Sequence, residues 1–168
     1  TGASNVAMGY NALGANTTAN DNTSVGFRTL QANTTGTFNT AVGARSLYVN
    51  TTGSGNTSVG EDSLAANTTA NDNTAFGQNA LKANTTGTQN TAVGRNAGAS
   101  VTTGTQNTLI GGLAGDALTD ADYNVAIGYT ALSADTLGSR SVAIGRAALQ
   151  VQNFTSATNA YNTAVGFA

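Results

Sequence analysis

Residues 39–55 read Asn-Thr-Ala-Val-Gly-Ala-Arg-Ser-Leu-Tyr-Val-Asn-Thr-Thr-Gly-Ser-Gly, and variants of this unit follow one another along the whole chain of 168 residues. Positions in the unit are counted from its first residue, the anchor, as position zero. The ten anchors are Asn5, Asn22, Asn39, Asn56, Asn73, Asn90, Asn107, Asn124, Ser141 and Asn162. Eight successive intervals between anchors are 17 residues long, and the last is 21. A fixed period of this size is typical of a solenoid, in which each repeat is one turn stacked on the next.

The repeats predict a single all-β domain over residues 1–168, with about ten turns and an insertion loop at residues 152–161. The loop accounts for the longer last interval. Thr1 and Gly2 match the end of a repeat, and residues 165–168 stop midway through another. We therefore expect the sequence to be a fragment of a longer fibre protein.

Composition argues against several classes of function. The chain has no Cys, His, Pro or Trp, so it has no disulfide, no Cys/His zinc site and none of the usual pairs of nucleophile and base. Charged residues make up 8% of the sequence and the net charge is −2, which argues against a nucleic-acid partner. No apolar run approaches the roughly 20 residues that span a membrane. We expect a protein that is not an enzyme, needs no cofactor and inserts no segment into a membrane.

The pattern within one repeat predicts two short strands in each turn. Position three is always apolar, position four is always Gly, and position eight is Leu in seven repeats. Side chains alternate along a strand, so a first strand over positions zero to four is expected to place positions one and three inward. A second strand over positions six to ten is expected to point its Leu inward. Two apolar rows favour a flattened two-sided parallel β-roll over a three-sided β-helix, which requires three such rows.

Position two is expected to face outward, opposite to positions one and three. It is Ala or Ser in nine of the ten repeats. A uniformly small outward face suits close packing against another chain, so we predict association along the full length of the rod. The predicted interface residues are Ala7, Ser24, Ala41, Ser58, Ala75, Ala92, Ala126, Ala143 and Ala164.

The segments 124–128 (Asn-Val-Ala-Ile-Gly) and 141–145 (Ser-Val-Ala-Ile-Gly) resemble the head repeat of YadA-type trimeric autotransporter adhesins. The form Asn-Thr-Ala-Val-Gly-x-x-x-Leu, as at residues 39–47, is similar to repeats of phage tail fibres and of the mosaic adhesive trimers of predatory bacteria. The resemblance covers essentially the whole chain, although the Asn-Thr-Thr-Gly segment makes the repeat longer than that of YadA-type heads. It implies a left-handed parallel β-roll, a homotrimer around one axis, and a role in surface adhesion or host recognition.

Candidate ligand-binding residues lie in two places. The insertion loop carries Asn153, Phe154 and Tyr161, and loops that project from a rigid scaffold commonly bind partners. A harmless bulge, or a transition to a following domain, is the simpler interpretation of this loop and the one that we favour. Arg28 and Arg45 occupy position six of adjacent turns, where they would stack about 4.8 Å apart and face an anion. Asp62 holds the same position in the next turn and is expected to neutralise them.

Two further patterns suggest a metal site and an ice-binding plane. Asp116, Asp120 and Asp122 form the densest acidic group, but their spacing matches no known calcium loop, so a solvated turn is the preferred interpretation. Rows of Thr at positions one, twelve and thirteen suggest an ice-binding plane. The expected inward orientation of position one argues against that use.

Three functions stay open on the sequence alone. We favour a trimeric surface adhesin or fibre segment, at the cell surface or outside the cell, on a bacterium or a phage tail. Its partner is expected to be a glycan or protein of a host, prey or matrix surface. The first alternative is a monomeric solenoid that binds ice or a glycan, and the second is a purely structural fibre spacer.

Overall fold

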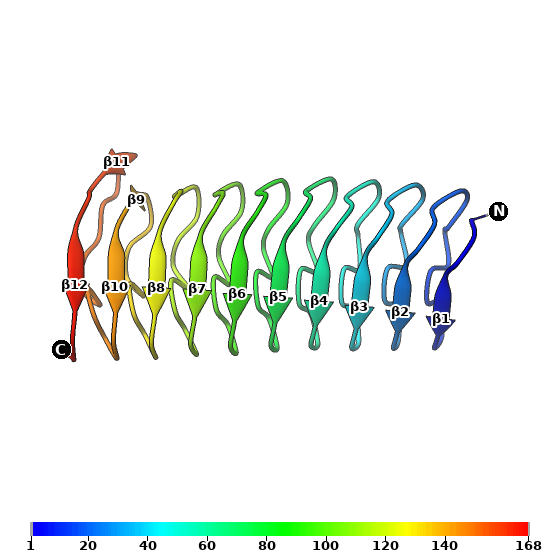
Figure 1. Ribbon diagram of the computed structural model, residues 1–168, viewed down its shortest axis with the longest axis horizontal. Helices are drawn as coiled ribbons and strands as arrows, with labels where there is room; N and C mark the ends of the chain where they lie inside the picture. The colour runs from blue at the N-terminus through cyan, green and yellow to red at the C-terminus, as the bar shows by residue number, and fades with distance from the viewer. Residues whose placement is uncertain (1, 168) are drawn as a thin grey trace.

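The computed structural model describes residues 2–167, in which the chain winds into a β-solenoid with its repeats stacked along one axis (Figure 1). One strand from each repeat joins a single ten-stranded parallel sheet. In sheet order these are β1 (Val6–Met8), β2 (Thr23–Val25), β3 (Thr40–Val42), β4 (Thr57–Val59), β5 (Thr74–Phe76), β6 (Thr91–Val93), β7 (Thr108–Ile110), β8 (Val125–Ile127), β10 (Val142–Ile144) and β12 (Thr163–Val165). Equivalent positions of successive repeats lie opposite each other, as Thr40 does with Thr57. The parallel all-β solenoid predicted from the period is confirmed.

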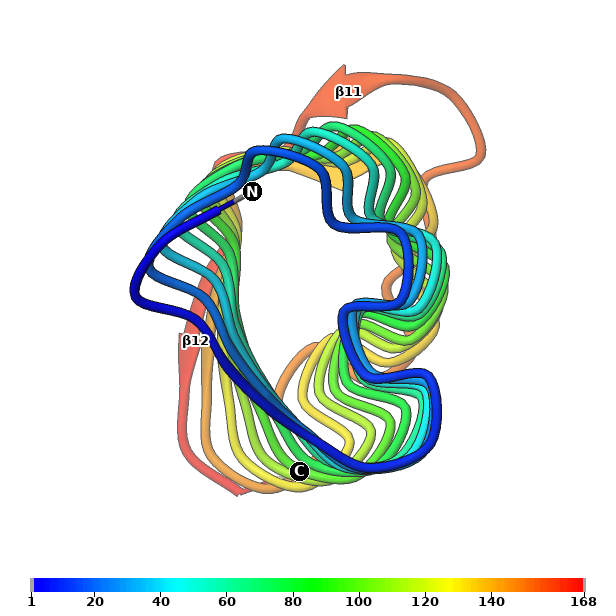
Figure 2. The same cartoon turned by 90° about the vertical axis from the view of Figure 1, so that its right-hand side faces the viewer.

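The longer last interval adds a strand that pairs with the preceding repeat in a small second sheet, separate from the main one. β9 (Gly138–Ser139) and β11 (Thr158–Asn159) pair in parallel, and β11 lies beyond the outline that the other turns share (Figure 2). The register of the main sheet continues across this insertion, with Val142 of β10 opposite Thr163 of β12. The extra residues therefore project without interrupting the stack.

Position two faces the interior of the solenoid, which reverses the predicted orientation of the strands. Ala75 and Ala92 are 0% exposed in the single chain, whereas Phe76 at position three is 55% exposed. A side chain without exposed surface cannot contact a second chain. The predicted trimer interface is therefore wrong at the buried members, Ser24, Ala41, Ser58, Ala75, Ala92, Ala126 and Ala143. Ala7 and Ala164 belong to the two end strands and are not fully buried.

Positions four to ten form turns where the sequence predicts a second strand. Arg45 and Leu47, at positions six and eight, have φ angles of 55° and 49°, and other repeats share this left-handed conformation. A strand cannot pass through such residues, because the chain curls instead of extending. The turns still pair along the axis, since Leu47 N donates to the carbonyl oxygen of Ser63 at 3.1 Å. The leucine side chains point inward as predicted and are 0% exposed in Leu30, Leu47, Leu64, Leu81 and Leu132.

Two rows of buried asparagine connect the turns inside the solenoid. At position zero, Asn56 N donates to Asn39 Oδ1 at 3.0 Å, and Asn56 Nδ2 donates to the carbonyl oxygen of Ala70 at 2.8 Å. At position eleven, Asn67 Nδ2 donates to Asn50 Oδ1 at 2.7 Å and to the same carbonyl of Ala70 at 3.2 Å. An unsatisfied buried polar group costs about 1–3 kcal/mol, so these bonds allow amides to fill the core.

Glycine at position four is required both by its backbone conformation and by the next turn. Gly60 has a φ of 132°, and a Cβ atom there would lie 2.6 Å from the carbonyl oxygen of Gly77. The same arrangement recurs along the stack, from Gly9 against Gly26 to Gly145 against Gly166. Successive turns therefore meet backbone to backbone along this line.

We expect Gly60→Ala to destabilise the fold by about 2–4 kcal/mol, because the new methyl group meets both a strained φ and the backbone of the next turn. Thermal unfolding followed by circular dichroism measures the effect. Gly112→Ala is the control, since its Cβ would lie 3.4 Å from the nearest atom, in the ring of Tyr129. Equal melting temperatures for the two variants would contradict the prediction.

Leu109 fills the core beside two glycines that interrupt the leucine row. Gly98 and Gly115 stand at position eight, and Leu109 alone breaks the Ala/Ser pattern of position two. A Cβ atom on Gly98 would lie 2.6 Å from Leu109 Cδ1, and one on Gly115 would lie 2.7 Å from its Cδ2. Val101 and Leu118 replace the position-eleven asparagine in the same two repeats and are also buried. These substitutions compensate one another.

A double-mutant cycle tests this compensation. Leu109→Ala should cost about 2–5 kcal/mol by leaving a cavity, and Gly98→Leu should be destabilising because its side chain collides with Leu109. The double variant should cost less than the sum by at least about 1 kcal/mol, because the new leucine occupies the vacated space. Denaturant unfolding of the four proteins measures the coupling. Additive effects would show that the two positions are independent.

Candidate functional site

The outward face of the main sheet carries a continuous row of apolar side chains at position three, and aromatic residues at position five widen this row in four turns; together we call them the apolar stripe. Position five is polar or charged at Glu61, Gln78, Arg95 and Arg146. The most exposed members of the stripe are Met8, Tyr10, Phe27, Phe76, Val93, Ile110, Tyr129, Val165 and Phe167. Val25, Val42, Val59, Ile127 and Ile144 continue the stripe with partly exposed side chains. Because every strand of the sheet contributes a residue, the stripe runs the length of the solenoid.

At its N-terminal end the stripe includes a stacked aromatic pair. The rings of Tyr10 and Phe27 lie 5.6 Å apart between centroids and are inclined by 15°. The guanidinium carbon of Arg28 lies 5.1 Å from the centroid of Phe27. Arg28, one of the two arginines predicted to bind an anion, therefore packs against an aromatic residue of the stripe.

A row of threonines shares the outward face with the apolar stripe. Its members, at position one, are Thr23, Thr40, Thr57, Thr74, Thr91 and Thr108. Within residues 2–167 none of these six hydroxyls bonds to another protein group. Their expected inward orientation is wrong, because positions one and three are both turned away from the core. The objection to an ordered threonine plane on this face is thereby removed.

The threonines of position twelve serve the fold instead. Thr51 Oγ1 donates to the carbonyl oxygen of Thr68 at 3.1 Å, and Thr68 Oγ1 donates to that of Thr85 at 3.2 Å. The same bond recurs in the neighbouring turns, as between Thr85 and Thr102. These hydroxyls hold the turns together, which separates them from the unbonded row at position one.

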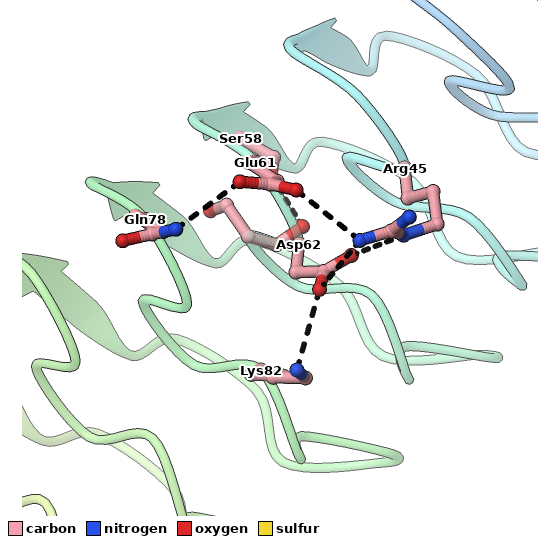
Figure 3. A network of polar contacts seen from close by, with 7 residues as sticks. Arg45, Ser58, Glu61, Asp62, Gln78 and Lys82 are labelled. Atoms are coloured by element: carbon pink, nitrogen blue, oxygen red, sulfur yellow. Dashed lines mark hydrogen bonds and ion pairs between the residues drawn. The ribbon is translucent and has the colours of Figure 1, made fainter.

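Arg45 belongs to an ion-pair network that spans three turns (Figure 3). Its Nε donates to Asp62 Oδ1 at 2.6 Å, its Nη2 donates to Asp62 Oδ2 at 3.0 Å, and the same Nη2 reaches Glu61 Oε1 at 3.3 Å. Lys82 Nζ lies 3.3 Å from Asp62 Oδ2. The hydrogen bond from Arg45 holds the pKa of Asp62 below its ordinary value. Asp62 neutralises Arg45 as predicted, and this leaves the proposed Arg28–Arg45 pair without an open charge on Arg45.

The three aspartates suggested as a weak metal site do not converge. Asp122 Oδ1 accepts hydrogen bonds from Thr105 N at 2.6 Å and from Thr105 Oγ1 at 3.0 Å, and Asp120 accepts one from the hydroxyl of Thr103. Asp116 is partly buried, which raises the pKa of its carboxyl group. In the part of the chain that the structure describes, no three acidic side chains gather as a metal site would require.

Asp135, which sequence analysis did not single out, anchors the insertion loop. It replaces the position-eleven asparagine, and its Oδ1 accepts hydrogen bonds from Phe154 N and Gly138 N, each at 3.0 Å. Its Oδ2 accepts one from Gln152 Nε2 at 2.6 Å. The change from Asn to Asp beside the long interval was the available signal, because a carboxylate accepts more hydrogen bonds than an amide oxygen.

Anchoring leaves the predicted loop residues in different settings. Asn153 Oδ1 accepts a hydrogen bond from Thr136 Oγ1 at 3.2 Å, and Phe154 is partly buried, with its carbonyl oxygen bonded to the same hydroxyl. Tyr161 is 68% exposed and lies directly before an anchor, as the position-sixteen residues of the regular repeats do. Tyr123 is exposed at the equivalent position, with Arg140 in the turn between them. Asn153 and Tyr161 are exposed and Phe154 is partly buried, and their contacts do not join them into one site.

Comparisons with protein-family models, curated proteins and solved structures find no match for this chain. Its described residues enclose no pocket. They also include no helix with the length and apolar character needed to cross a membrane. The candidate sites of residues 2–167 are therefore surfaces, and the apolar stripe is the most extensive of them.

We expect Asp62→Asn to lower the melting temperature at pH 7 and to have less effect in acid. The folded-state pKa of Asp62 lies below the ordinary value of 3.8. The ionised carboxylate therefore stabilises the fold above pH 3.8, and this stabilisation is lost as the pH falls through the folded-state pKa. Melting curves of both proteins from pH 7 down to pH 2 measure the difference. Glu61→Gln, which removes one longer contact to Arg45, is the control and should have a smaller effect. A difference that stays constant into strong acid would contradict the prediction.

Proposed function

We propose that this chain is a segment of a homotrimeric fibre that attaches a bacterium or a phage to a target surface. The supporting observation is the apolar stripe, whose position-three row leaves uncovered apolar side chains along the full length of the rod. Monomeric soluble proteins rarely expose contiguous apolar patches larger than a few hundred Å², and larger patches usually mark interfaces. Resemblance to YadA-type head repeats supports three chains and a left-handed winding.

The proposed interface is the apolar stripe, in place of the buried position-two residues. Burying a large apolar side chain contributes about 1.5–3 kcal/mol to association. Each strand of the sheet supplies one such side chain, so these contributions add along the rod. The strands are about 4.8 Å apart, so the ten rungs give a contact about 45 Å long. A stripe of this kind can face a common axis in three identical parallel rods, each contacting the next through heterologous contacts that close into a ring.

The proposed work of the trimer is attachment, at the cell surface or outside the cell. A stiff rod holds its ligand-binding groups at a fixed distance from the body that carries it. Three copies of a weak site act together, so that avidity replaces the deep pocket that residues 2–167 lack. A glycan or protein of a host, prey or matrix surface is the proposed partner. In the spacer alternative, the same trimer forms but other parts of the fibre bind.

The outward threonine row favours a second candidate, a monomeric solenoid that binds ice. Six unbonded hydroxyls lie in register at intervals of about 4.8 Å, each two residues from an apolar side chain of the same strand. A flat, regular array of this kind can order water molecules on a lattice. The two candidates use the same face, so a trimer that covers the stripe would also cover the threonines.

Light scattering on the purified segment distinguishes the two candidates. We expect a mass near three times 16.6 kDa, and we expect the variant Phe76→Lys/Ile110→Lys to shift the mass to 16.6 kDa by placing charges in the stripe. The matched control is Thr86→Lys/Ser100→Lys, which adds the same charges at exposed positions outside the stripe. The control should stay trimeric.

A mass of 16.6 kDa for the unmodified segment would overturn the trimer. Thermal hysteresis of that monomer, abolished by substituting Thr57 and Thr74 with leucine, would then establish the ice-binding candidate. A monomer without hysteresis would overturn both candidates.

A further inference from the structure

Tyr123, Arg140 and Tyr161 lie directly before the anchors of three successive turns and form a row that we call the position-sixteen row. Tyr161 is at position twenty of its own repeat because that repeat is four residues longer. The guanidinium carbon of Arg140 lies 4.5 Å from the ring centroid of Tyr123 and 5.9 Å from that of Tyr161. All three side chains are exposed. Position sixteen precedes the strand, about 13 Å along the chain from position three, so this row borders the opposite edge of the sheet from position five.

The backbone and the insertion hold this row in place. The φ angles of the three residues are 59°, 65° and 52°, and Arg140 N donates to the carbonyl oxygen of Asp122 at 3.0 Å. Arg140 Nε donates to Asn159 Oδ1 at 3.1 Å, and Asn159 lies in β11, the strand that the insertion adds (Figure 2). The four-residue excess of the last repeat therefore supplies Asn159 and positions Tyr161 after it. A preorganised guanidinium loses less entropy when it binds.

The charge of Arg140 has no counterion within residues 2–167. Its only hydrogen bond to protein there is the bond from Nε to the Asn159 amide, so both Nη groups face solvent. Arg45 differs, because Asp62 and Glu61 occupy its donors. Arginine presents its two Nη groups as a planar fork that matches the two oxygens of a carboxylate. The insertion thus positions Arg140 through Asn159 and leaves both Nη groups of the arginine available to a ligand.

We propose that Tyr123, Arg140, Asn159 and Tyr161 bind a sugar that carries a carboxylate, such as a terminal sialic acid. The Nη groups of Arg140 pair with the carboxylate, and Asn159 Nδ2 remains free to donate to a hydroxyl or acyl oxygen of the sugar. The exposed ring of Tyr161 packs against the C–H face of the sugar. This inference rests on the proposed adhesive function and deepens it by naming the class of ligand.

The chemistry of the row favours an acidic sugar over other anions. The site is shallow and has no pocket, which suits the end of a glycan chain better than a small metabolite. Arg140 is the only basic residue of its row, and in a chain of net charge −2 it does not form the basic track that a nucleic acid requires. The exposed ring of Tyr161 beside the charge provides flat apolar surface, which a sugar ring uses and an inorganic anion does not.

Saturation-transfer NMR with 3′-sialyllactose, with lactose as the neutral probe, tests the site on the intact segment. We expect sialyllactose to bind and lactose to bind at least about tenfold more weakly. Arg140→Gln should weaken sialyllactose binding at least about tenfold, because it removes a charge-assisted pair of hydrogen bonds. Lys82→Gln is the control, since it makes the same charge change at an exposed residue away from the row. Tyr161→Ala should reduce binding while leaving the charge in place.

Circular dichroism and light scattering on the same samples separate loss of binding from loss of structure. Equal binding of the two sugars, or unchanged binding by Arg140→Gln, would overturn the proposed site. A trimer that binds no sialyllactose would also overturn it and would leave the trimeric fibre standing. A monomer that binds through Arg140 would support the site and overturn the trimer.

Discussion

The close contact between glycines at position four sets the distance and alignment at which each turn of this solenoid meets the next. Gly60 and Gly77 approach so closely that a single methyl group has no room, and this contact recurs along the stack. Once the backbones are held at that separation, buried asparagines can bond from turn to turn and equivalent strand positions can pair. The same alignment also produces the rows of equivalent side chains on the outer surface, which are the apolar stripe, the threonine row and the position-sixteen row.

Much of the fold follows from the sequence because the period is so regular. The 17-residue spacing predicts the parallel stack, and the recurrent leucine at position eight correctly marks the core. The orientation of the strands could not be obtained from hydrophobicity alone. Apolar β-branched residues at position three suggested an interior, but the space inside is already filled by position-eight leucines and by asparagines. Where position eight is leucine, position two is always Ala or Ser, so a small residue signals the interior in this fold. Left-handed φ angles at leucine, as in Leu47, also carry no sequence signal, because most residues of this kind avoid them.

The candidate sites were less predictable than the fold, because they depend on contacts between turns. Asp62 was correctly expected to neutralise Arg45, since both stand at position six of neighbouring turns. Tyr161 was noticed as an exposed aromatic in the insertion, but its relation to Arg140 depends on the way β11 returns to β9. Composition indicated that catalysis was an unpromising explanation, and surface geometry now indicates where binding groups lie. The outward sheet face and the position-sixteen row are separate surfaces, so one can serve assembly while the other contacts a ligand.

The irregular core around Leu109 has a consequence for how such a repetitive chain reaches one native state. Nearly identical repeats allow a strand to pair one whole repeat out of place with little loss of local contacts. Leu109 fits only between Gly98 and Gly115, and a shifted pairing would place it against a leucine of the regular row or leave a void beside the glycines. These three residues therefore specify the native register, because a stack paired one repeat out of place is less stable. A break in the repeat pattern thus gives an otherwise uniform rod a unique alignment.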